Sequence, residues 1–418
     1  MSDESFQLKL IKINKILDVT FYSGSIRLGD LFNHFDVPIY KTGIDVTADG
    51  GGYQREASPS RVTDVAIRMT KKDPGQEIPN ADAFVDNINL NIRSVAAEMS
   101  YVKPLDEKYT EFGDVHTFDY IDKLGKFYIV DGQTRLKGAH QAYRNAMDNK
   151  EFKLADDIKN LRLQITLTFC EDKYKEAYIF YLINQHSKKI PTSGATRLLY
   201  EGQVHNSISF VNEINRSQKF DDVDTMKMVQ YLSDHSDVWA GNIADFNESN
   251  KNKIPINTFV RISKSLYKKV RLHIDTLEDS SIKPHDLTSE IVEAFWCGIK
   301  QAYPIMFAMN NNTKFNILNA GTVEVLMDFL GALFDKSIAG ELAKLGQLTD
   351  PATFKNLMKD IFDSYEDTNG NDIRVTGVNL FIIGKEGVFG KYGNSQEKKN
   401  ASKKIMIEAF KVLGMAVP

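Results

Sequence analysis

The segment KFYIVDGQTRLKGAHQAY, residues 126–143, places an acid, an amide and a guanidinium within five positions. These are Asp131, Gln133 and Arg135, with Gly132 and Thr134 between them. A carboxylate can hold Mg²⁺ or orient an arginine, whereas a guanidinium binds phosphate through two parallel hydrogen bonds. This pentapeptide is therefore the first candidate in the chain for catalysis or for binding a charged ligand.

The flanking residues predict that the pentapeptide joins a strand to a helix. Residues 127–130 are an apolar run typical of a buried strand, and apolar residues then follow at helical spacing: Leu136, Ala139, Tyr143 and Met147. The first N–H groups of a helix lack partners and attract anions. Arg135 opposes the helix dipole by roughly 0.3–1 kcal/mol, which favours a bound anion. In the alternative interpretation, Asp131 merely caps the helix.

A second glycine-hinged segment, GGGYQREASPSRV, places Gln54 and Arg55 shortly after three glycines, with Tyr53 between. If this segment faces the pentapeptide, the two together form a pocket rich in hydrogen-bond donors, with Asp131 as its only nearby acid. Such a pocket fits a nucleotide or a DNA phosphate, and Asp131 is available for Mg²⁺. The alternative for Gln54 and Arg55 is an ordinary solvated turn.

The first half of the chain alternates strand and helix patterns, which predicts an α/β domain. Strands are expected in residues 83–96 and 162–170, and helices from Pro59 onward and in residues 152–161 and 172–185. Beyond about residue 203 the pattern is mainly helical. We therefore predict an α/β (α+β) domain in residues 1–205 and a mainly helical domain in residues 206–418, with a hairpin within residues 373–393.

Composition excludes several classes of protein. The formal net charge of −4 argues against non-specific coating of nucleic acid, so any DNA site must be a local patch. Two cysteines without a CxxC pair, Cys170 and Cys297, fit a reducing cytoplasm. No stretch approaches the ~20 apolar residues of a membrane span, and neither zinc-site spacing nor a Walker-type phosphate loop occurs. We expect a soluble, cytoplasmic protein with no membrane partner.

Three basic segments are further candidates for contact with DNA. The loop INQHSKKIPTSGATR carries Lys188, Lys189 and Arg197, which could contact phosphates. The segment SKSLYKKVRLHI is a basic amphipathic helix, for which packing with an exposed basic face is favoured over entry into a DNA groove. Lysines and aromatic residues also mix in residues 385–404. A solvated surface is the alternative for each.

The segment IVDGQTRLKGA resembles the signature of DGQHR-motif proteins, the DndB-like branch of the ParB/sulfiredoxin-like fold. The upstream YQRE…SRVTDVA, the strand RLQITLTF and the helix ending in YLINQHSKKIPTS follow in the same order, and the resemblance covers residues ~35–200. It implies a ParB/sulfiredoxin-like N-terminal domain whose pocket signature is Asp131, Gly132, Gln133 and Arg135. Gln54, Arg55 and Asn184 match its other elements. Position 134 departs from the family, because Thr134 stands where His or Gln is usual.

The resemblance also implies a function. Such proteins accompany DNA-modification and antiviral defence systems, as DNA-binding regulators or nucleotide-hydrolysing accessory proteins. We therefore expect an accessory protein that binds ATP or another nucleotide, or DNA, and that works with other proteins of a DNA-modification operon. In the catalytic version, Asp131 positions Mg²⁺, Gln133 orients water, and Arg135 holds phosphate together with Gly132 and Thr134. The rival is a DNA-binding regulator without catalysis, and the oligomeric state stays open.

Overall fold

The computed structural model describes residues 5–40, 51–71, 87–105, 114–186, 192–217, 219–245, 253–277, 281–308, 315–339 and 347–364, together with positions 381, 400, 403, 404, 407 and 411. The chain divides into two compact units. Unit 1 comprises Met1–Pro191 and Gly202–Val211, and unit 2 comprises Thr192–Glu201 and Asn212–Pro418. Two helices at the division, α7 (Thr192–Val204) and α8 (Ile208–Ser217), contribute residues to both units.

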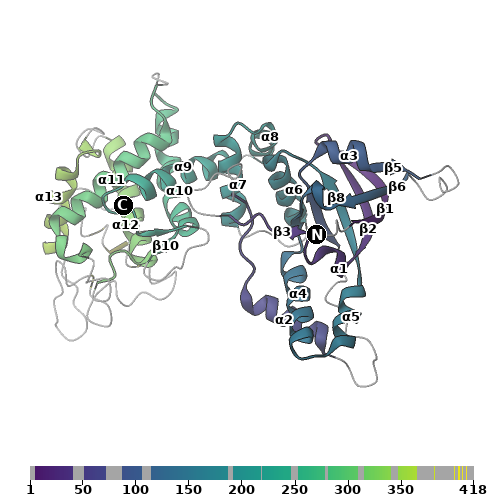
Figure 1. The fold of residues 1–418 in the computed structure, drawn as a ribbon. Helices are drawn as coiled ribbons and strands as arrows, with labels where there is room; N and C mark the ends of the chain where they lie inside the picture. Colours follow the sequence, from purple (N-terminus) through teal and green to yellow (C-terminus); the bar gives the residue numbers. More distant parts are fainter. Residues whose placement is uncertain are drawn as a thin grey trace. The chain divides into compact units, whose positions relative to one another are not determined.

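Unit 1 is built on a mixed sheet, shown in Figure 1. Its eight strands lie in the order β3 (Phe35–Asp36), β7 (Phe127–Asp131), β4 (Ile88–Ile92), β8 (Arg162–Phe169), β2 (Val19–Arg27), β1 (Ser5–Ile16), β6 (Val115–Ile121) and β5 (Val102–Pro104). Strand β4 runs parallel to β8 and antiparallel to β7. A mixed α/β unit was predicted here, and the structure confirms it at that level.

Alternation along the strands divides the apolar residues between two cores, because successive side chains of a strand point to opposite faces. On β7, Ile129 belongs to the larger core, whereas its neighbour Val130 belongs to a smaller one. The larger core receives α2 (Pro59–Thr70), α4 (Gln133–Asp148) and α5 (Phe152–Asn160). The smaller core receives α6 (Lys173–His186). The β7–α4 connection therefore lies at the boundary between two packed layers.

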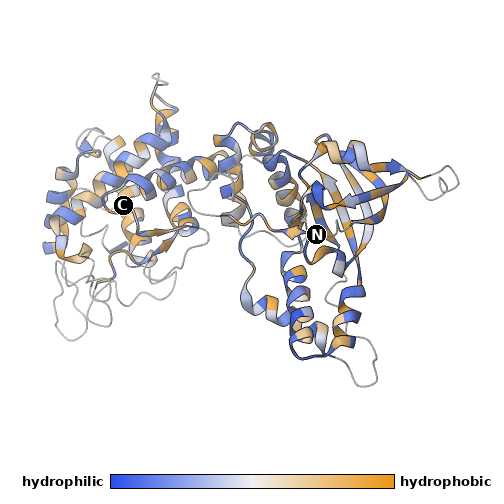
Figure 2. Ribbon diagram, in the orientation of Figure 1, coloured by the Kyte–Doolittle hydropathy of each residue, from blue (hydrophilic) through white to orange (hydrophobic). Residues whose placement is uncertain are grey.

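The strand and helix predicted around the pentapeptide are confirmed as β7 and α4. The predicted buried face of α4 is only partly right: Leu136 and Ala139 are buried, but Met147 is 41% exposed. Ala142 and Ala146 complete the buried face instead. Small residues lie on this side because α4 packs closely on α2; a Cβ on Gly138 would come within 2.5 Å of Val65. Figure 2 shows the resulting mixture of blue and orange residues along both helices.

Three short helices complete the described part of unit 1. They are α1 (Leu28–Leu31), the 3₁₀ helix η3 (Asp122–Leu124) and α3 (Val95–Tyr101), which is capped by a hydrogen bond from Ala97 N to Ser94 Oγ of 3.1 Å. The β1–β2 hairpin turns through Leu17 and Asp18, both with positive φ, as a two-residue type I′ turn requires.

Unit 2 is mainly helical where the structure describes it. Its helices are α9 (Phe220–His235), α10 (Ile256–Ile274), α11 (Pro284–Ala302), η4 (Pro304–Phe307), α12 (Ala320–Ile338) and α13 (Pro351–Ser364). Strands β9 (Ile243–Ala244) and β10 (Ile254–Pro255) form a small parallel pair. Trp239 and Trp296 are fully buried in the apolar core of unit 2, with ring centroids 4.8 Å apart. The hairpin predicted within residues 373–393 lies outside the described residues, apart from Phe381.

The described part of the chain contains no helix that is both long enough and apolar enough to cross a membrane.

Candidate functional site

The pentapeptide forms a tight junction between β7 and α4. Gly132 is the residue before the first turn of α4, and its φ of +97° is left-handed. Only glycine adopts this conformation readily, and a Cβ there would also approach Ile88 Cγ1 to 3.0 Å. No side chain caps the helix, and its first turn contains no acid. The interpretation of Asp131 as a helix cap is therefore wrong.

Arg135 is held beside the uncapped helix start. Its Nη2 donates to the main-chain oxygen of Asn87 at 3.1 Å and to Asp131 Oδ2 at 3.3 Å. The side chains of Arg135 and Asp131 are 18% and 34% exposed. Because the ion pair is half-buried and reinforced by a main-chain acceptor, it fixes the direction of the guanidinium more firmly than a surface pair does.

The two glycine-hinged segments meet, as the pocket hypothesis requires. Gln133 Nε2 donates to the main-chain oxygen of Arg55, and Gln54 Nε2 donates to the main-chain oxygens of Ile129 and Val130, the latter at 3.2 Å. Gln54 is 2% exposed, whereas the Arg55 side chain lies at the surface. The amide of Gln54 therefore ties its segment to β7 and is not presented to a ligand.

The close approach of the upstream segment depends on its glycines. A Cβ on Gly52 would lie 2.3 Å from the main-chain oxygen of Pro38, which is also the acceptor for Tyr53 N and Gln54 N. A side chain at position 52 would thus separate two main-chain segments that hydrogen-bond to each other. The glycine run predicted as a flexible hinge instead forms a fixed contact at Gly52.

A buried polar network supports this arrangement, although no sequence pattern predicted it. Glu176 of α6, 1% exposed, accepts from Tyr53 Oη at 2.9 Å, from Arg93 Nη2 at 2.7 Å and from Asn91 Nδ2. The Arg93 guanidinium also lies 3.7 Å from the centre of the Tyr128 ring. A buried ion pair is tolerated when further hydrogen bonds satisfy it, as they do here. The network joins the upstream segment, β4, β7 and α6 beneath the junction.

The junction also presents oxygen acceptors. Gln133 Oε1 and Asn87 Oδ1 are buried and accept no hydrogen bond from the described residues. Asn87 is additionally fixed by a bond from its Nδ2 to Thr166 Oγ1. Together with the Asp131 carboxylate, these amide oxygens are of the hard type that Mg²⁺ prefers.

Among the described residues, one group of acidic and cysteine side chains could hold a metal ion. Asp237, Glu293 and Cys297, in unit 2, offer ligand atoms within 4.8 Å of one another. Burial raises the pKa of the Cys297 thiol to about 12, with Glu293 as a further cause. The thiol instead donates to Glu293 Oε1 at 3.1 Å. This hydrogen bond lies within α11, and Glu293 also accepts from the main-chain N–H of Asp237 at 2.9 Å, which ties α11 to the turn after α9.

The remaining predicted site residues differ in their surroundings. Thr134 is half-buried in the first turn of α4 and forms no hydrogen bond through its hydroxyl with a described residue. Asn184 donates to the main-chain oxygen of Phe180 at 2.9 Å within α6. Lys188 and Lys189 lie outside the described residues.

Arg197 was predicted to contact DNA phosphate, but in the structure its guanidinium binds other side chains of the protein. Its guanidinium donates to Glu201 Oε1 at 2.7 Å and to Gln230 Oε1, and its side chain is only 12% exposed. The charge is thus engaged within unit 2.

The basic helix SKSLYKKVRLHI lies in α10, and its cations are largely neutralised. Arg261, Lys264, Lys268, Lys269 and Arg271 pair with acids of α9 and α12: Asp221, Asp222, Glu324 and Asp335. The preference for helix packing over a DNA groove agrees with these contacts, although the basic face is paired and not free. Of the basic patch predicted in residues 385–404, only positions 400, 403 and 404 are described.

No protein family model matches the chain, and neither a curated protein nor a solved structure was found to be similar to it.

Proposed function

We propose that the protein binds phosphate, from a nucleotide or from DNA, at the junction of β7 and α4. The observation that carries this proposal is the start of α4, which has no side-chain cap and no acid but has Arg135 in its first turn. A missing cap costs about 0.5–2 kcal/mol, and the arginine adds repulsion with the helix dipole. A bound anion removes both penalties, because it accepts from N–H groups of the first turn, which have no acceptor within the helix, and faces the guanidinium.

Binding is better supported than hydrolysis. Gln133, the residue expected to orient an attacking water, uses its amide N–H to hold the main-chain oxygen of Arg55. Thr134 supplies a hydroxyl that can donate to phosphate but cannot carry a proton as histidine does. ATP hydrolysis at the junction therefore remains a narrower hypothesis, in which Asp131 and the two unpartnered amide oxygens receive Mg²⁺ together with the nucleotide.

The wider assignment rests on the resemblance of IVDGQTRLKGA and its neighbouring segments to DGQHR-motif proteins. We propose on that basis that unit 1 has the ParB/sulfiredoxin-like fold. On the same basis, the protein is a cytoplasmic accessory component of a prokaryotic DNA-modification or defence system. The rival within this assignment is a regulator that binds DNA phosphate without catalysis.

The binding proposal is tested by titrating ATP, with and without Mg²⁺, into wild-type protein and three variants. Arg135→Ala is expected to weaken binding by on the order of tenfold or more, because it removes a charge-assisted hydrogen bond. Arg135→Lys is expected to recover only part of the loss, because lysine lacks the planar fork. Arg144→Ala, an exposed change on the same helix, is the control. Equal binding by Arg135→Ala and Arg144→Ala would exclude the junction as the nucleotide site.

The same variants separate the catalytic and regulatory versions. Phosphate release from ATP that falls in Arg135→Ala but not in Arg144→Ala supports hydrolysis at the junction. For DNA, retention of a duplex on the wild-type protein is measured at rising salt, and phosphate contact predicts a steep decline. A flat response between low and physiological salt contradicts phosphate-driven binding.

A further inference from the structure

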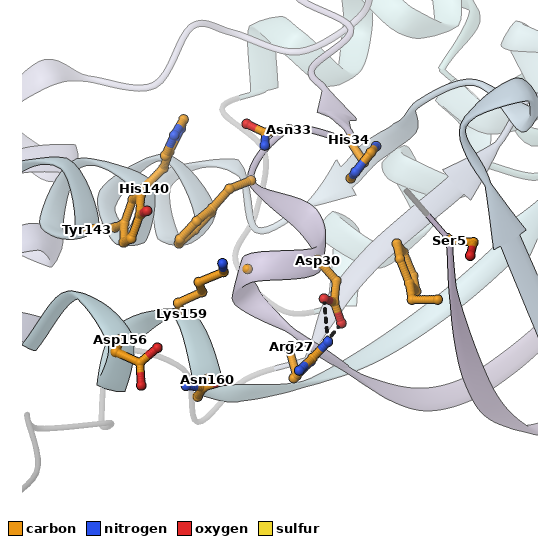
Figure 3. Close-up of a pocket in the computed structure, with 13 residues that line it drawn as sticks. Ser5, Arg27, Asp30, Asn33, His34, His140, Tyr143, Asp156, Lys159 and Asn160 are labelled. Atoms are coloured by element: carbon orange, nitrogen blue, oxygen red, sulfur yellow. Dashed lines mark hydrogen bonds and ion pairs between the residues drawn. The ribbon is translucent and has the colours of Figure 1, made fainter. Parts of the chain in front are cut away.

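A second candidate site lies in unit 1, at a cavity of about 450 Å³. Figure 3 shows its lining side chains, which come from α1 and the turn after it, from α4, from α5 and from the first residues of β1. None of the five pentapeptide residues lines it. Cavities of a few hundred Å³ are of the size that binds small organic ligands. The cavity is therefore a site in its own right and not an extension of the junction.

Aromatic rings form one wall of the cavity. Phe32 stacks on His140 with ring centroids 4.9 Å apart, and Tyr143 lies against the same phenyl ring at 5.1 Å. Burial lowers the pKa of His140, and nearby Arg144 lowers it further, so this environment favours the neutral form of the imidazole. A wall of neutral rings is suited to a planar, heteroaromatic group such as a nucleobase. Every base has a π-face, so this packing depends little on which base is bound.

Polar side chains around this wall are not engaged by the protein. Within the described part of the chain, no hydrogen bond or ion pair is formed by the side chains of Asn33, Tyr143, Asp156, Lys159 and Asn160. By contrast, the other cation of the lining, Arg27, is neutralised by Asp30 through two bonds of 3.0 Å. The cavity thus offers an ammonium group and a carboxylate that are not paired with each other, two amides and a phenol.

The position of Lys159 depends on Gly29. A Cβ on Gly29 would lie 2.4 Å from Lys159 Cγ, so the lysine stem runs directly over this glycine. In Figure 3 the ammonium end of Lys159 lies on the same side as His140 and Tyr143, whereas Asp156 and Asn160 lie beside the base of its stem. The absence of a side chain at position 29 therefore permits a single cation to lie across α1 at the cavity.

We propose that this cavity binds a nucleoside monophosphate. Lys159 would hold the phosphate, the Phe32–His140–Tyr143 wall would contact the base, and Asn33 and Asn160 would hydrogen-bond to its edge. Asp156 would accept from a sugar hydroxyl or an exocyclic amine. Amides suit this task because they both donate and accept, as the edge of a base does. A single lysine favours one phosphate over a triphosphate, which requires more positive charge or a metal ion.

The proposal is tested by calorimetric titration of AMP, GMP, CMP and UMP into the full chain without Mg²⁺. We expect saturable binding of at least one of them. Lys159→Gln is expected to weaken it by on the order of ten- to a hundredfold, as loss of a charge-assisted contact does. Lys153→Gln, an equal change of charge on the same helix, is the control and should bind as the wild type does. Thermal unfolding of each variant verifies that it is folded.

A second variant tests the geometry without removing the charge. Gly29→Ala is expected to push Lys159 aside and to weaken binding while the net charge of the protein is unchanged. Arg135→Ala should leave the Lys159-dependent part of monophosphate binding intact, which separates this site from the junction. Absence of saturable binding by all four nucleotides at millimolar concentration overturns the proposal. So does equal weakening by Lys159→Gln and Lys153→Gln, or loss of the Lys159-dependent binding in Arg135→Ala.

Discussion

At the scale of single residues, the left-handed conformation of Gly132 makes the junction specific to glycine. We predict that Gly132→Ala destabilises the protein by about 1–2 kcal/mol from backbone strain, with a further cost because the new Cβ approaches Ile88. Urea unfolding measures this loss. Gly241→Ala is the control, since Gly241 also has positive φ but a Cβ there meets no atom within 4 Å. If Gly241→Ala is equally destabilising, the contact with Ile88 contributes nothing.

The second residue-scale prediction concerns Glu176. Replacement by alanine leaves Arg93 buried without its partner, and we expect a loss of about 3–5 kcal/mol in the free energy of unfolding. Tyr53→Phe removes only one donor to the same carboxylate and should cost about 1 kcal/mol. Chemical denaturation distinguishes the two. Similar losses for both variants would show that Arg93 finds another partner when Glu176 is absent.

Burial of the two thiols gives a pH dependence with a definite sign. It raises the pKa of Cys170 to about 11 and contributes to raising that of Cys297 to about 12, against an ordinary value of 9.0. Below pH 9 both states keep the thiol protons; above it the unfolded chain loses them first, so stability falls as pH rises toward the folded values. We expect denaturant midpoints to fall less between pH 8 and 10.5 in a Cys170→Ala, Cys297→Ala variant. An unchanged decline would contradict this assignment.

At the scale of elements, the packing of α10 against α9 and α12 includes ion pairs that contribute unequally to stability. Asp221, whose side chain is 17% exposed, pairs with both Lys268 and Arg271, whereas Asp335 is 55% exposed and pairs with Lys269. We predict that Asp221→Ala costs about 1.5–3 kcal/mol and that Asp335→Ala costs less than about 1 kcal/mol. Unfolding of the two variants at low and high salt tests this order. Equal costs would mean that burial does not distinguish the pairs.

The sequence predicted elements well where one short pattern determined them. The run of residues 127–130, the glycine and the apolar spacing after it located β7, the junction and α4. Strand β1 was not predicted, because the isoleucines of its outer half, Ile11, Ile13 and Ile16, are exposed and mark no buried face. In its inner half only Leu8 and Leu10 are buried, and they pair with Phe118 and His116 of β6, more than a hundred residues away.

The sequence predicted that the two glycine-hinged segments meet, but it did not predict the contacts between them. Gln54 and Gln133 were expected to present donors, yet both donate to main-chain oxygens that only the fold brings near. The Glu176–Arg93–Tyr53 network could not be found from spacing, because its members lie 83 and 123 positions apart. A lone glutamate within an apolar helix was the available signal, since such a residue is rarely buried without a partner.

At the scale of the whole molecule, each unit has its own apolar core, and we expect two separable unfolding transitions. Leu136→Ala, in unit 1, and Phe295→Ala, in unit 2, each remove a fully buried side chain and should cost about 2–5 kcal/mol. Differential scanning calorimetry should show each variant shifting a different transition. A single transition that both variants shift together would show that the units unfold as one.

Thr192–Glu201 belong to unit 2, whereas the later residues Gly202–Val211 belong to unit 1. This order has a practical consequence for anyone who wishes to divide the gene. A fragment that stops at Pro191 discards Phe210, a fully buried ring that packs on Tyr178 and Tyr181 of unit 1. The two tyrosines would then be left facing solvent, and the truncated product would be prone to aggregate. Two separately expressed halves would each need the α7–α8 stretch, so this stretch has to be encoded twice.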